Sequence, residues 1–174
     1  MNLTIRHSTA SELPELMQVH REAFGGEAEP ELTRALLHDT GGAPHVSLVA
    51  IENGILVGHV LLTRLKVGND RDGCAILCPL AALPGAQRKG VGTALVTAAQ
   101  TAATEMGIDT ICVLGDPKYY GRFGFVDACR KGLLPPFTLP PEYSEAWQVW
   151  PESTTRKGQS RPADALMKPE FWDA

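Results

Sequence analysis

A short glycine-rich stretch around residue 90 carries the most chemically informative residues of the chain. Arg88 and Lys89 precede Gly90, Val91 and Gly92, where an apolar run gives way to an amphipathic helical pattern. The first amides of a helix have no partner within the helix, and the helix dipole adds partial positive charge at that end. Because glycine carries no side chain that would cover these amides, the stretch predicts a binding site for a phosphate group.

Two common nucleotide-binding motifs do not fit this stretch. A P-loop requires Lys and then Ser or Thr after its second glycine, and Val91 and Gly92 stand there instead. A Rossmann fingerprint requires a third glycine where the chain has Leu95, and the preceding strands look antiparallel. The remaining pattern is Q-x-x-G-x-G, formed by Gln87, Gly90 and Gly92. By itself it leaves open an ordinary helix start whose glycines serve packing.

The elements that must position this stretch follow from periodicity and turn residues. The dipeptide Asn53-Gly54 predicts a hairpin, so the middle of the chain reads as an antiparallel meander. The strand–helix–strand unit from Cys74 to Leu114 predicts a right-handed parallel crossover, which makes an α/β (α+β) fold with a mixed, mostly antiparallel sheet. Strands are predicted at residues 3–7, 46–52, 55–66, 74–83, 110–114 and 125–129, and helices at 9–24, 30–40 and 90–106. The predicted buried arc of the third helix is Val91, Ala94, Leu95, Ala98, Ala102 and Met106.

A second motif follows the strand at residues 110–114. The run Gly115-Asp116-Pro117-Lys118-Tyr119-Tyr120 leads into Arg122-Phe123-Gly124-Phe125. It resembles the short helix and Tyr-x-x-x-Gly-Phe ending of the GNAT superfamily of N-acetyltransferases, whose pyrophosphate-binding turn the Q-x-x-G-x-G pattern also resembles. Together with Leu80-Ala81-Ala82, these motifs are similar to those of the small bacterial YhbS-like N-acetyltransferases. The resemblance covers residues 3–134.

The resemblance implies a GNAT-like sheet with helices on both faces. It also implies that the strand ending at Ala82 and Leu83 splays from its neighbour at residues 110–114. The pantetheine arm of acetyl-CoA would lie between them, and the diphosphate would lie on the amides that follow Gln87. The residues expected to contact acetyl-CoA are Ala81, Ala82, Leu83, Gln87, Arg88, Lys89, Gly90, Val91, Gly92, Thr93 and Asp116.

The function implied is direct transfer of an acetyl group from acetyl-CoA, as co-substrate, to a primary amine of an unidentified small-molecule or peptide acceptor. Tyr120 matches the tyrosine that protonates the departing thiolate in many members of the superfamily. A phenol can donate that proton if it lies within hydrogen-bonding reach. Packing of the ring is the alternative for Tyr120 and the preferred interpretation for Tyr119. The alternative functions are a non-catalytic acyl-CoA sensor and a protein-interaction module with the same fold.

The chain departs from the superfamily pattern at two places. Val113 stands where many members carry asparagine, so that contact is absent or is replaced, with Asp116 as the candidate. The strand at residues 74–83 contains no carboxylate, although many members carry a glutamate base there. The general base is therefore not assigned, because each candidate is also explained as a solvated acid or a core histidine. The candidates are Glu27, Glu29, Glu31, His45, His59 and Asp116.

Composition narrows the class of protein further. The formal net charge of −4 argues against a nucleic-acid partner. No apolar run is long enough for a membrane span and the N-terminus does not resemble a signal peptide, so we expect a cytoplasmic protein without a membrane partner. The four cysteines lack the spacing of a zinc site, so we expect no metal.

The length of 174 residues predicts a single N-acetyltransferase domain over residues 1–174, with a core at residues 3–134. Residues 135–174 are rich in proline, and we expect them to pack on the core as irregular structure with one or two edge strands near residues 146–150. The aromatic residues of this tail could line an acceptor pocket, pack on the sheet or support a homodimer. They are Tyr143, Trp147, Trp150 and Trp172.

Overall fold

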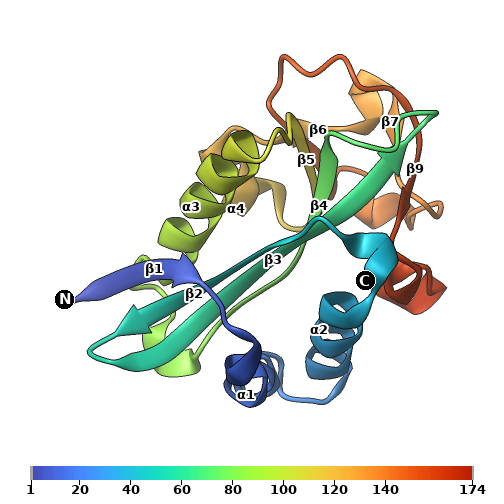
Figure 1. Ribbon diagram of the computed structural model, residues 1–174. Helices are drawn as coiled ribbons and strands as arrows, with labels where there is room; N and C mark the ends of the chain where they lie inside the picture. Colours follow the sequence, from blue (N-terminus) through green and yellow to red (C-terminus); the bar gives the residue numbers. More distant parts are fainter. Residues whose placement is uncertain (1, 174) are drawn as a thin grey trace.

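Nine strands and four α-helices lie along residues 2–173, the part of the chain that the computed structural model describes (Figure 1). The strands are β1 (Leu3–His7), β2 (Val46–Glu52), β3 (Ile55–Val67), β4 (Cys74–Ala82), β5 (Thr110–Leu114), β6 (Val126–Asp127), β7 (Leu133–Leu134), β8 (Trp147–Trp150) and β9 (Gly158–Pro162). The helices are α1 (Leu13–Phe24), α2 (Ala28–His38), α3 (Val91–Glu105) and α4 (Pro117–Tyr120). The sheet order is β1-β2-β3-β4-β5-β8-β6, and β9 pairs with both β3 and β7.

The first four strands form the antiparallel meander that the hairpin signal predicts. β1 pairs with β2, β2 with β3, and β3 with β4, all antiparallel. Asn53 and Gly54 adopt φ of 51° and 81°, the positive values that a tight hairpin turn of this kind needs. β5 then runs parallel to β4, and the short pair β7–β9 is also parallel. The predicted mixed, mostly antiparallel sheet is confirmed.

Helices cover both faces of this sheet (Figure 1). On one face α3 packs its Leu95 against Leu62 of β3. On the other face α1 lies over β3 and β4, its Leu16 shares a buried cluster with Val49 of β2 and Ala81 of β4, and α2 lies beside α1 (Figure 1). α3 approaches β3 most closely at Gly58, where a Cβ atom would lie 2.9 Å from Leu95 Cδ1. The glycine therefore lets the first turn of α3, and the glycine-rich stretch before it, sit against the sheet.

The buried face of α3 differs from the predicted arc. Met106, which follows the helix, is 45% exposed, whereas Val96, Ala99 and Ala103 are fully buried. The prediction that Met106 faces the core is wrong. The helix is rich in alanine, whose small side chain gains little free energy from burial on either side. The sequence pattern therefore left the rotation of the helix about its axis undetermined, and packing against β2 and β3 decided it.

Helix starts shift by a few residues from their predicted positions. A 3₁₀ turn at Ala10–Glu12 precedes α1, and the Glu12 carboxylate accepts a hydrogen bond of 2.8 Å from the Thr9 amide, as expected for that pair. α2 begins at Ala28, so Pro30 lies in its first turn rather than at its first residue. Proline is tolerated in a first turn because its missing N–H would have no partner there.

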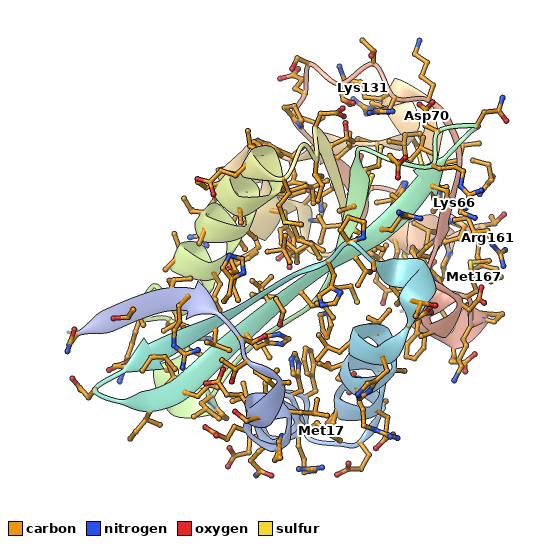
Figure 2. The ribbon with its side chains drawn as sticks, in the orientation of Figure 1. Met17, Lys66, Asp70, Lys131, Arg161 and Met167 are labelled. Carbon is orange, nitrogen blue, oxygen red and sulfur yellow. The ribbon has the colours of Figure 1, made fainter. Side chains whose placement is uncertain are left out.

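The C-terminal segment contributes a strand to the interior of the sheet rather than to its edge. β8 lies between β5 and β6 and pairs antiparallel with both, so the prediction of an edge strand at residues 146–150 is wrong. Trp147 of β8 is fully buried. β9, which the sequence did not predict, pairs with the end of β3 and sets Lys66 opposite Arg161 (Figure 2). Long-range pairing of this kind leaves no local pattern, which explains both misses.

β4 and β5 separate partway along their length. Their parallel pairing covers only Cys74–Ile76 of β4 against Thr110–Cys112 of β5. Beyond this point the register of β4 on β3 also shifts, because Leu62 pairs with Leu77 whereas Val60 pairs with Leu80. The extra residue is a bulge, which bends a strand away from regular pairing. The splay implied by the family resemblance is therefore present.

Candidate active site

The glycine-rich stretch forms an open turn at the beginning of α3. Gly90 is the N-cap residue with φ of 86°, a left-handed conformation that glycine adopts without strain. Arg88 also has a positive φ, of 63°. No side chain caps α3, and the amides of residues 88–93 donate no turn or loop hydrogen bond within residues 2–173. These amides and the helix dipole make the turn suited to an anion.

The side chains around the turn differ in position: one bonds to the end of β4, three are exposed and one is buried. The Gln87 side-chain amide donates a hydrogen bond of 3.1 Å to the Ala82 carbonyl and so ties the turn to the end of β4. Arg88, Lys89 and Thr93 are exposed beside the turn, while Val91 is buried in the core below it. The sequence-predicted residues 87–93 are thus brought together at one surface, with Val91 contributing its backbone rather than its side chain.

The end of β4 presents its backbone unequally. The Leu83 amide donates a hydrogen bond of 2.8 Å to the Val57 carbonyl of β3, so it is already engaged. Residues in an antiparallel ladder alternate between facing the partner strand and facing away from it. Ala82, which stands opposite Gly58, therefore directs its amide toward the gap between β4 and β5. Ala81 packs its side chain on the α1 side of the sheet.

Asp116 serves the structure of α4. Its carboxylate accepts a hydrogen bond of 2.9 Å from the Lys118 amide and caps the helix. The residue also lines a hollow of about 740 Å³ next to the start of α4. Val113 is buried in the core on the α3 side of the sheet. The capping bond explains Asp116 without a ligand, although the carboxylate keeps free lone pairs beside that hollow.

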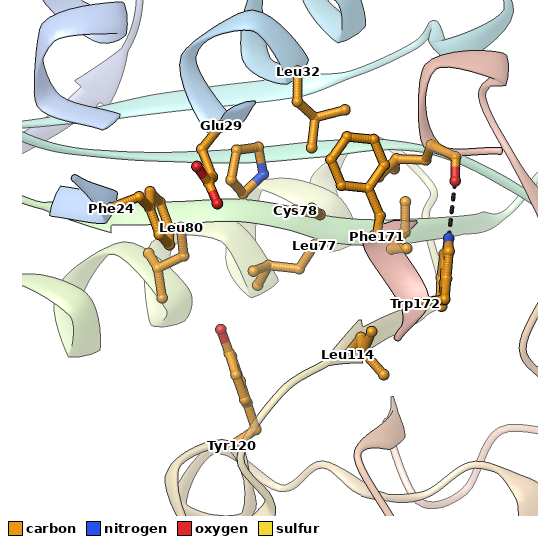
Figure 3. Close-up of a pocket in the computed structure, with 13 residues that line it drawn as sticks. Phe24, Glu29, Leu32, Leu77, Cys78, Leu80, Leu114, Tyr120, Phe171 and Trp172 are labelled. Carbon is orange, nitrogen blue, oxygen red and sulfur yellow. Dashed lines mark hydrogen bonds between the residues drawn. The ribbon is translucent and has the colours of Figure 1, made fainter. Parts of the chain in front are cut away.

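Two adjacent tyrosines of α4 point to different parts of the site. The Tyr119 hydroxyl lies against Gly92, so close that a Cβ atom on residue 92 would overlap it. Tyr120 points its hydroxyl into a cavity between β4 and β5 (Figure 3). The two rings stand nearly perpendicular with centroids 4.9 Å apart. α4 therefore contacts both the glycine-rich turn and the cavity through neighbouring side chains.

The cavity has a volume of about 270 Å³ and occupies the splay of the two strands (Figure 3). Its walls come from α1, α2, β4, β5, α4 and the C-terminal segment. The lining residues are Phe24, Glu29, Leu32, Ile76, Leu77, Cys78, Pro79, Leu80, Leu114, Tyr120, Leu166, Phe171 and Trp172. The wall is mostly apolar, with a few polar groups aimed into it, which is typical of a small-molecule site.

Burial keeps the two weak acids of the cavity wall protonated. It raises the pKa of the Tyr120 phenol above its ordinary value, with smaller contributions from Tyr119 and Cys78. Burial also raises the pKa of the Cys78 thiol to about 12, with a smaller contribution from the Glu29 charge. At neutral pH Tyr120 therefore retains its phenolic proton, and Cys78 is a thiol rather than a nucleophilic thiolate.

The structure separates the candidate bases. Glu27 is paired with Arg21, and Glu31 is paired with Arg34. Asp116 caps α4, as described above. Glu29, which lies in the first turn of α2, lines the cavity and points its carboxylate toward Tyr120 (Figure 3). The sequence offered this residue as one candidate among several but gave no means of ranking it, because only the packing of α2 over β4 brings it to the site.

His59 belongs to a buried polar chain. Its Nδ1 lies 2.8 Å from His20 Nε2 and its Nε2 lies 2.8 Å from Ser47 Oγ, which in turn lies 2.6 Å from Ser8 Oγ. Burial lowers the pKa of His59 to about 3, with a smaller contribution from His20, and lowers that of His20 to about 4. Both imidazoles are therefore neutral at neutral pH, and this series of hydrogen bonds connects α1 to β3 and β2.

The sequence did not point to three parts of the cavity wall. Phe24, the last residue of α1, is 46% exposed and faces the cavity. Phe171 and Leu166 lie in a segment without a recognisable pattern. Trp172 lines the cavity and also packs against Trp147, with ring centroids 5.5 Å apart, so the alternative that the tail aromatics pack on the sheet holds for this pair.

Metal-binding and membrane-spanning features are absent from the described part of the chain. Residues 2–173 contain no cluster of three or more His, Cys, Asp or Glu side chains that could hold a metal ion. Among these same residues, no helix has the length and apolar character needed to cross a membrane.

Comparison with known proteins identifies the class. The sequence profile of the acetyltransferase (GNAT) family matches residues 13–125, which include both the turn and α4. The chain therefore belongs to the GNAT acetyltransferases, a family of acyl-transferring enzymes. Within it, the chain is similar to the uncharacterized N-acetyltransferase YjhQ of Escherichia coli K12, with 35% identity over 156 residues that cover 84% of this chain and 86% of YjhQ.

A second relative and two solved structures agree with this placement in a YhbS-like group. YhbS of E. coli K12 is 28% identical over 132 residues, covering 75% of this chain and 78% of YhbS. The crystal structure of E. coli YhbS in complex with CoA has a TM-score of 0.87 at 24% identity and covers 97% of this chain and 93% of its own. A GNAT acetyltransferase from Brucella melitensis in complex with acetyl-CoA has a TM-score of 0.78 at 24% identity, over 95% of this chain and 98% of its own.

Proposed function

We propose that this protein transfers the acetyl group of acetyl-CoA to a primary amine by direct attack. The observation that carries the proposal is that adjacent tyrosines of α4 reach both places: Tyr119 lies against Gly92 of the open turn, and Tyr120 lines the cavity. The family membership and the CoA and acetyl-CoA bound by two proteins of similar fold support it. The acetyltransferase unit includes the tail, because Leu166, Phe171 and Trp172 complete the cavity.

The residues present fit acetyl-CoA. The amides of residues 88–93 would hold the diphosphate, with Arg88 and Lys89 adding positive charge beside it. The outward-facing amide of Ala82 would pair with the pantetheine arm, whereas its carbonyl already accepts the bond from Gln87. Leu83 would contribute contact rather than its amide, since that amide is bonded to β3. Gln87 would keep the turn and the strand end in register.

When bound, acetyl-CoA supplies an acetyl thioester that an amine can attack. Tyr120 would hold a proton for the sulfur that leaves, because burial keeps its phenol protonated. Cys78 keeps its proton as well, so the wall offers no ready thiolate to take the acetyl group first. This arrangement supports direct transfer.

Two measurements test the proposal. Acetyl-CoA should raise the midpoint of thermal unfolding, because a ligand that binds the folded state stabilises it. A panel of primary amines with acetyl-CoA should then release CoA and give products heavier by one acetyl group in mass spectra. A thermal shift without turnover on any amine would support a binding protein instead. Absence of a shift would support a protein that keeps the fold without the ligand.

A further inference from the structure

Glu29 has an unusual place in the cavity. Among the described residues that line this cavity it is the only one with a charged side chain, and the wall contains no Lys or Arg. Its carboxylate points across the cavity toward the Tyr120 hydroxyl (Figure 3). The acids on either side of it in the sequence, Glu27 and Glu31, are each held by an arginine outside the cavity. Glu29 is thus the acid of this segment that is left to meet a ligand.

The rest of the wall is apolar and aromatic. Phe24 and Leu80 lie at one side of Glu29, and Phe171 and Trp172 lie at the other (Figure 3). Phe24 is 46% exposed. A ligand that covers a large apolar side chain gains binding free energy from that burial. The cavity of about 270 Å³ also has to hold the acetyl end of acetyl-CoA, because it occupies the splay of β4 and β5, so the space left for an acceptor is smaller than this volume. The cavity therefore suits a compact apolar group.

We infer, on the basis of the proposed acetyl transfer, that the acceptor is a primary amine on a compact apolar or aromatic group without a carboxylate. Glu29 binds its ammonium group and takes its proton. An acceptor carboxylate would enter a cavity that offers no cation and already contains one negative charge, which is costly away from water. Amines attached to an aryl-alkyl or branched alkyl group meet the aromatic wall and the single charge together.

The chemistry balances with the groups present. The amine arrives as an ammonium ion, and Glu29 takes one proton from it. The freed nitrogen lone pair then forms a bond to the acetyl carbonyl carbon, and the carbon–sulfur bond breaks. Tyr120 gives its proton to the departing sulfur, and the second nitrogen proton replaces it on Tyr120. The proton on Glu29 passes to water, so the products are an acetamide, CoA and one proton.

A panel of matched amines tests the substrate class, with acetyl-CoA at saturation and CoA release as the readout. We expect kcat/KM to be roughly 100-fold higher for 2-phenylethylamine than for phenylalanine, which differs by a carboxylate. We expect a similar preference for isopentylamine over 1,4-diaminobutane, whose second ammonium group would be buried without a partner. Phe171→Ala should raise KM for 2-phenylethylamine about tenfold and leave that for methylamine unchanged.

A pair of variants on α2 tests the role of Glu29. Glu29→Gln should lower kcat/KM for 2-phenylethylamine roughly 100-fold at neutral pH. The deficit should shrink near pH 9.5, because more of the amine then arrives already neutral. The other titratable groups on the wall, Cys78 and Tyr120, keep their protons in this range, since burial raises both pKa values. Glu31→Gln removes a charge from the same helix outside the cavity and should leave the rate unchanged.

The outcomes separate this inference from the proposed function. Turnover of polar amines or of phenylalanine at rates equal to 2-phenylethylamine would overturn the inference and leave acetyl transfer standing. A Glu29→Gln protein that still shows the acetyl-CoA thermal shift and retains the wild-type rate would overturn the role of Glu29. If no amine in the panel releases CoA although acetyl-CoA binds, the proposed function fails and the inference fails with it.

Discussion

The glycine-rich turn at residues 87–93 and the cavity at Tyr120 are built in opposite ways. The turn uses consecutive residues and offers mainly backbone amides and the end of one helix. The cavity draws side chains from six separate parts of the chain, from Phe24 on α1 to Trp172 near the end. Ligand recognition by backbone needs only a local conformation, whereas recognition by assembled side chains depends on the whole fold. We therefore expect changes in the turn to affect acetyl-CoA and changes in the cavity to affect turnover and acceptor choice.

The largest effect on this comparison should come from Tyr120→Phe. Loss of the proton donor should lower turnover roughly 10²- to 10⁴-fold, while the affinity for acetyl-CoA stays close to wild type. Steady-state CoA release and calorimetric titration of acetyl-CoA measure the two separately. Tyr143→Phe, which removes the same hydroxyl from an exposed 3₁₀ turn, serves as the matched control. Equal turnover of Tyr120→Phe and wild type would remove Tyr120 from the chemistry.

Gly92→Glu should have the converse effect. A carboxylate in the turn repels the diphosphate and its side chain displaces Tyr119, so the dissociation constant of acetyl-CoA should rise roughly 100-fold or more. Thr104→Glu adds the same charge near the other end of α3, on its exposed side, and should bind acetyl-CoA like wild type. If the Gly92→Glu protein folds and binds acetyl-CoA normally, the diphosphate does not lie on this turn.

A double variant asks how the turn and α4 are coupled. Gly92→Ala places a Cβ atom on the Tyr119 hydroxyl, and we expect it to weaken acetyl-CoA binding about tenfold and to lower the midpoint of unfolding by about 3 °C. Tyr119→Phe in the same protein removes the clashing oxygen, and the next ring atom lies 3.7 Å from the place that this Cβ would occupy, an ordinary contact. We expect both losses to recover. If stability returns and affinity does not, the ligand itself requires a glycine at position 92.

The smallest effect should come from the buried histidines that hold α1 on the cavity side of the sheet. Because burial lowers the pKa values of His20 and His59 to about 4 and about 3, the unfolded chain takes up protons before the folded one does. Their contribution to stability is complete above the unfolded pKa of about 6.5 and decreases as the pH falls below it toward these folded values. The midpoint of unfolding should therefore fall between about pH 7.5 and pH 5.5 by a few degrees.

His20→Gln is the variant that checks this assignment. It removes one of the two titrating groups, so its unfolding midpoint should change less over the same pH range than that of wild type. Differential scanning calorimetry at both pH values gives the comparison. Identical pH dependence in the two proteins would contradict neutral, buried histidines in the folded state.

Local features of the fold were predictable because neighbouring residues determine them. β2 and β5 begin and end where the sequence predicts, and the Asn53-Gly54 turn forms. The turn before α3 follows the same logic. The place of β8 inside the sheet and the existence of β9 were not predictable, because each depends on a partner strand far away in the sequence. The rotation of α3 about its axis was predicted wrongly for a related reason. The helix is rich in alanine, so its sequence does not distinguish the buried face from the exposed one.

The residues of the candidate site also fall into two groups, those that the sequence predicted and those that only the tertiary structure identified. By itself the sequence predicted the class of ligand at the turn, because a glycine-rich, basic helix start exposes amides whatever surrounds it. It also determined Tyr120 as a candidate proton donor, through the resemblance of its motif. Only the tertiary structure decided that Glu29, rather than Glu27 or Glu31, faces the cavity, and that Phe24 and Phe171 shape it. Side chains that meet across a cavity are selected by the packing of distant elements, and a linear sequence does not record that packing.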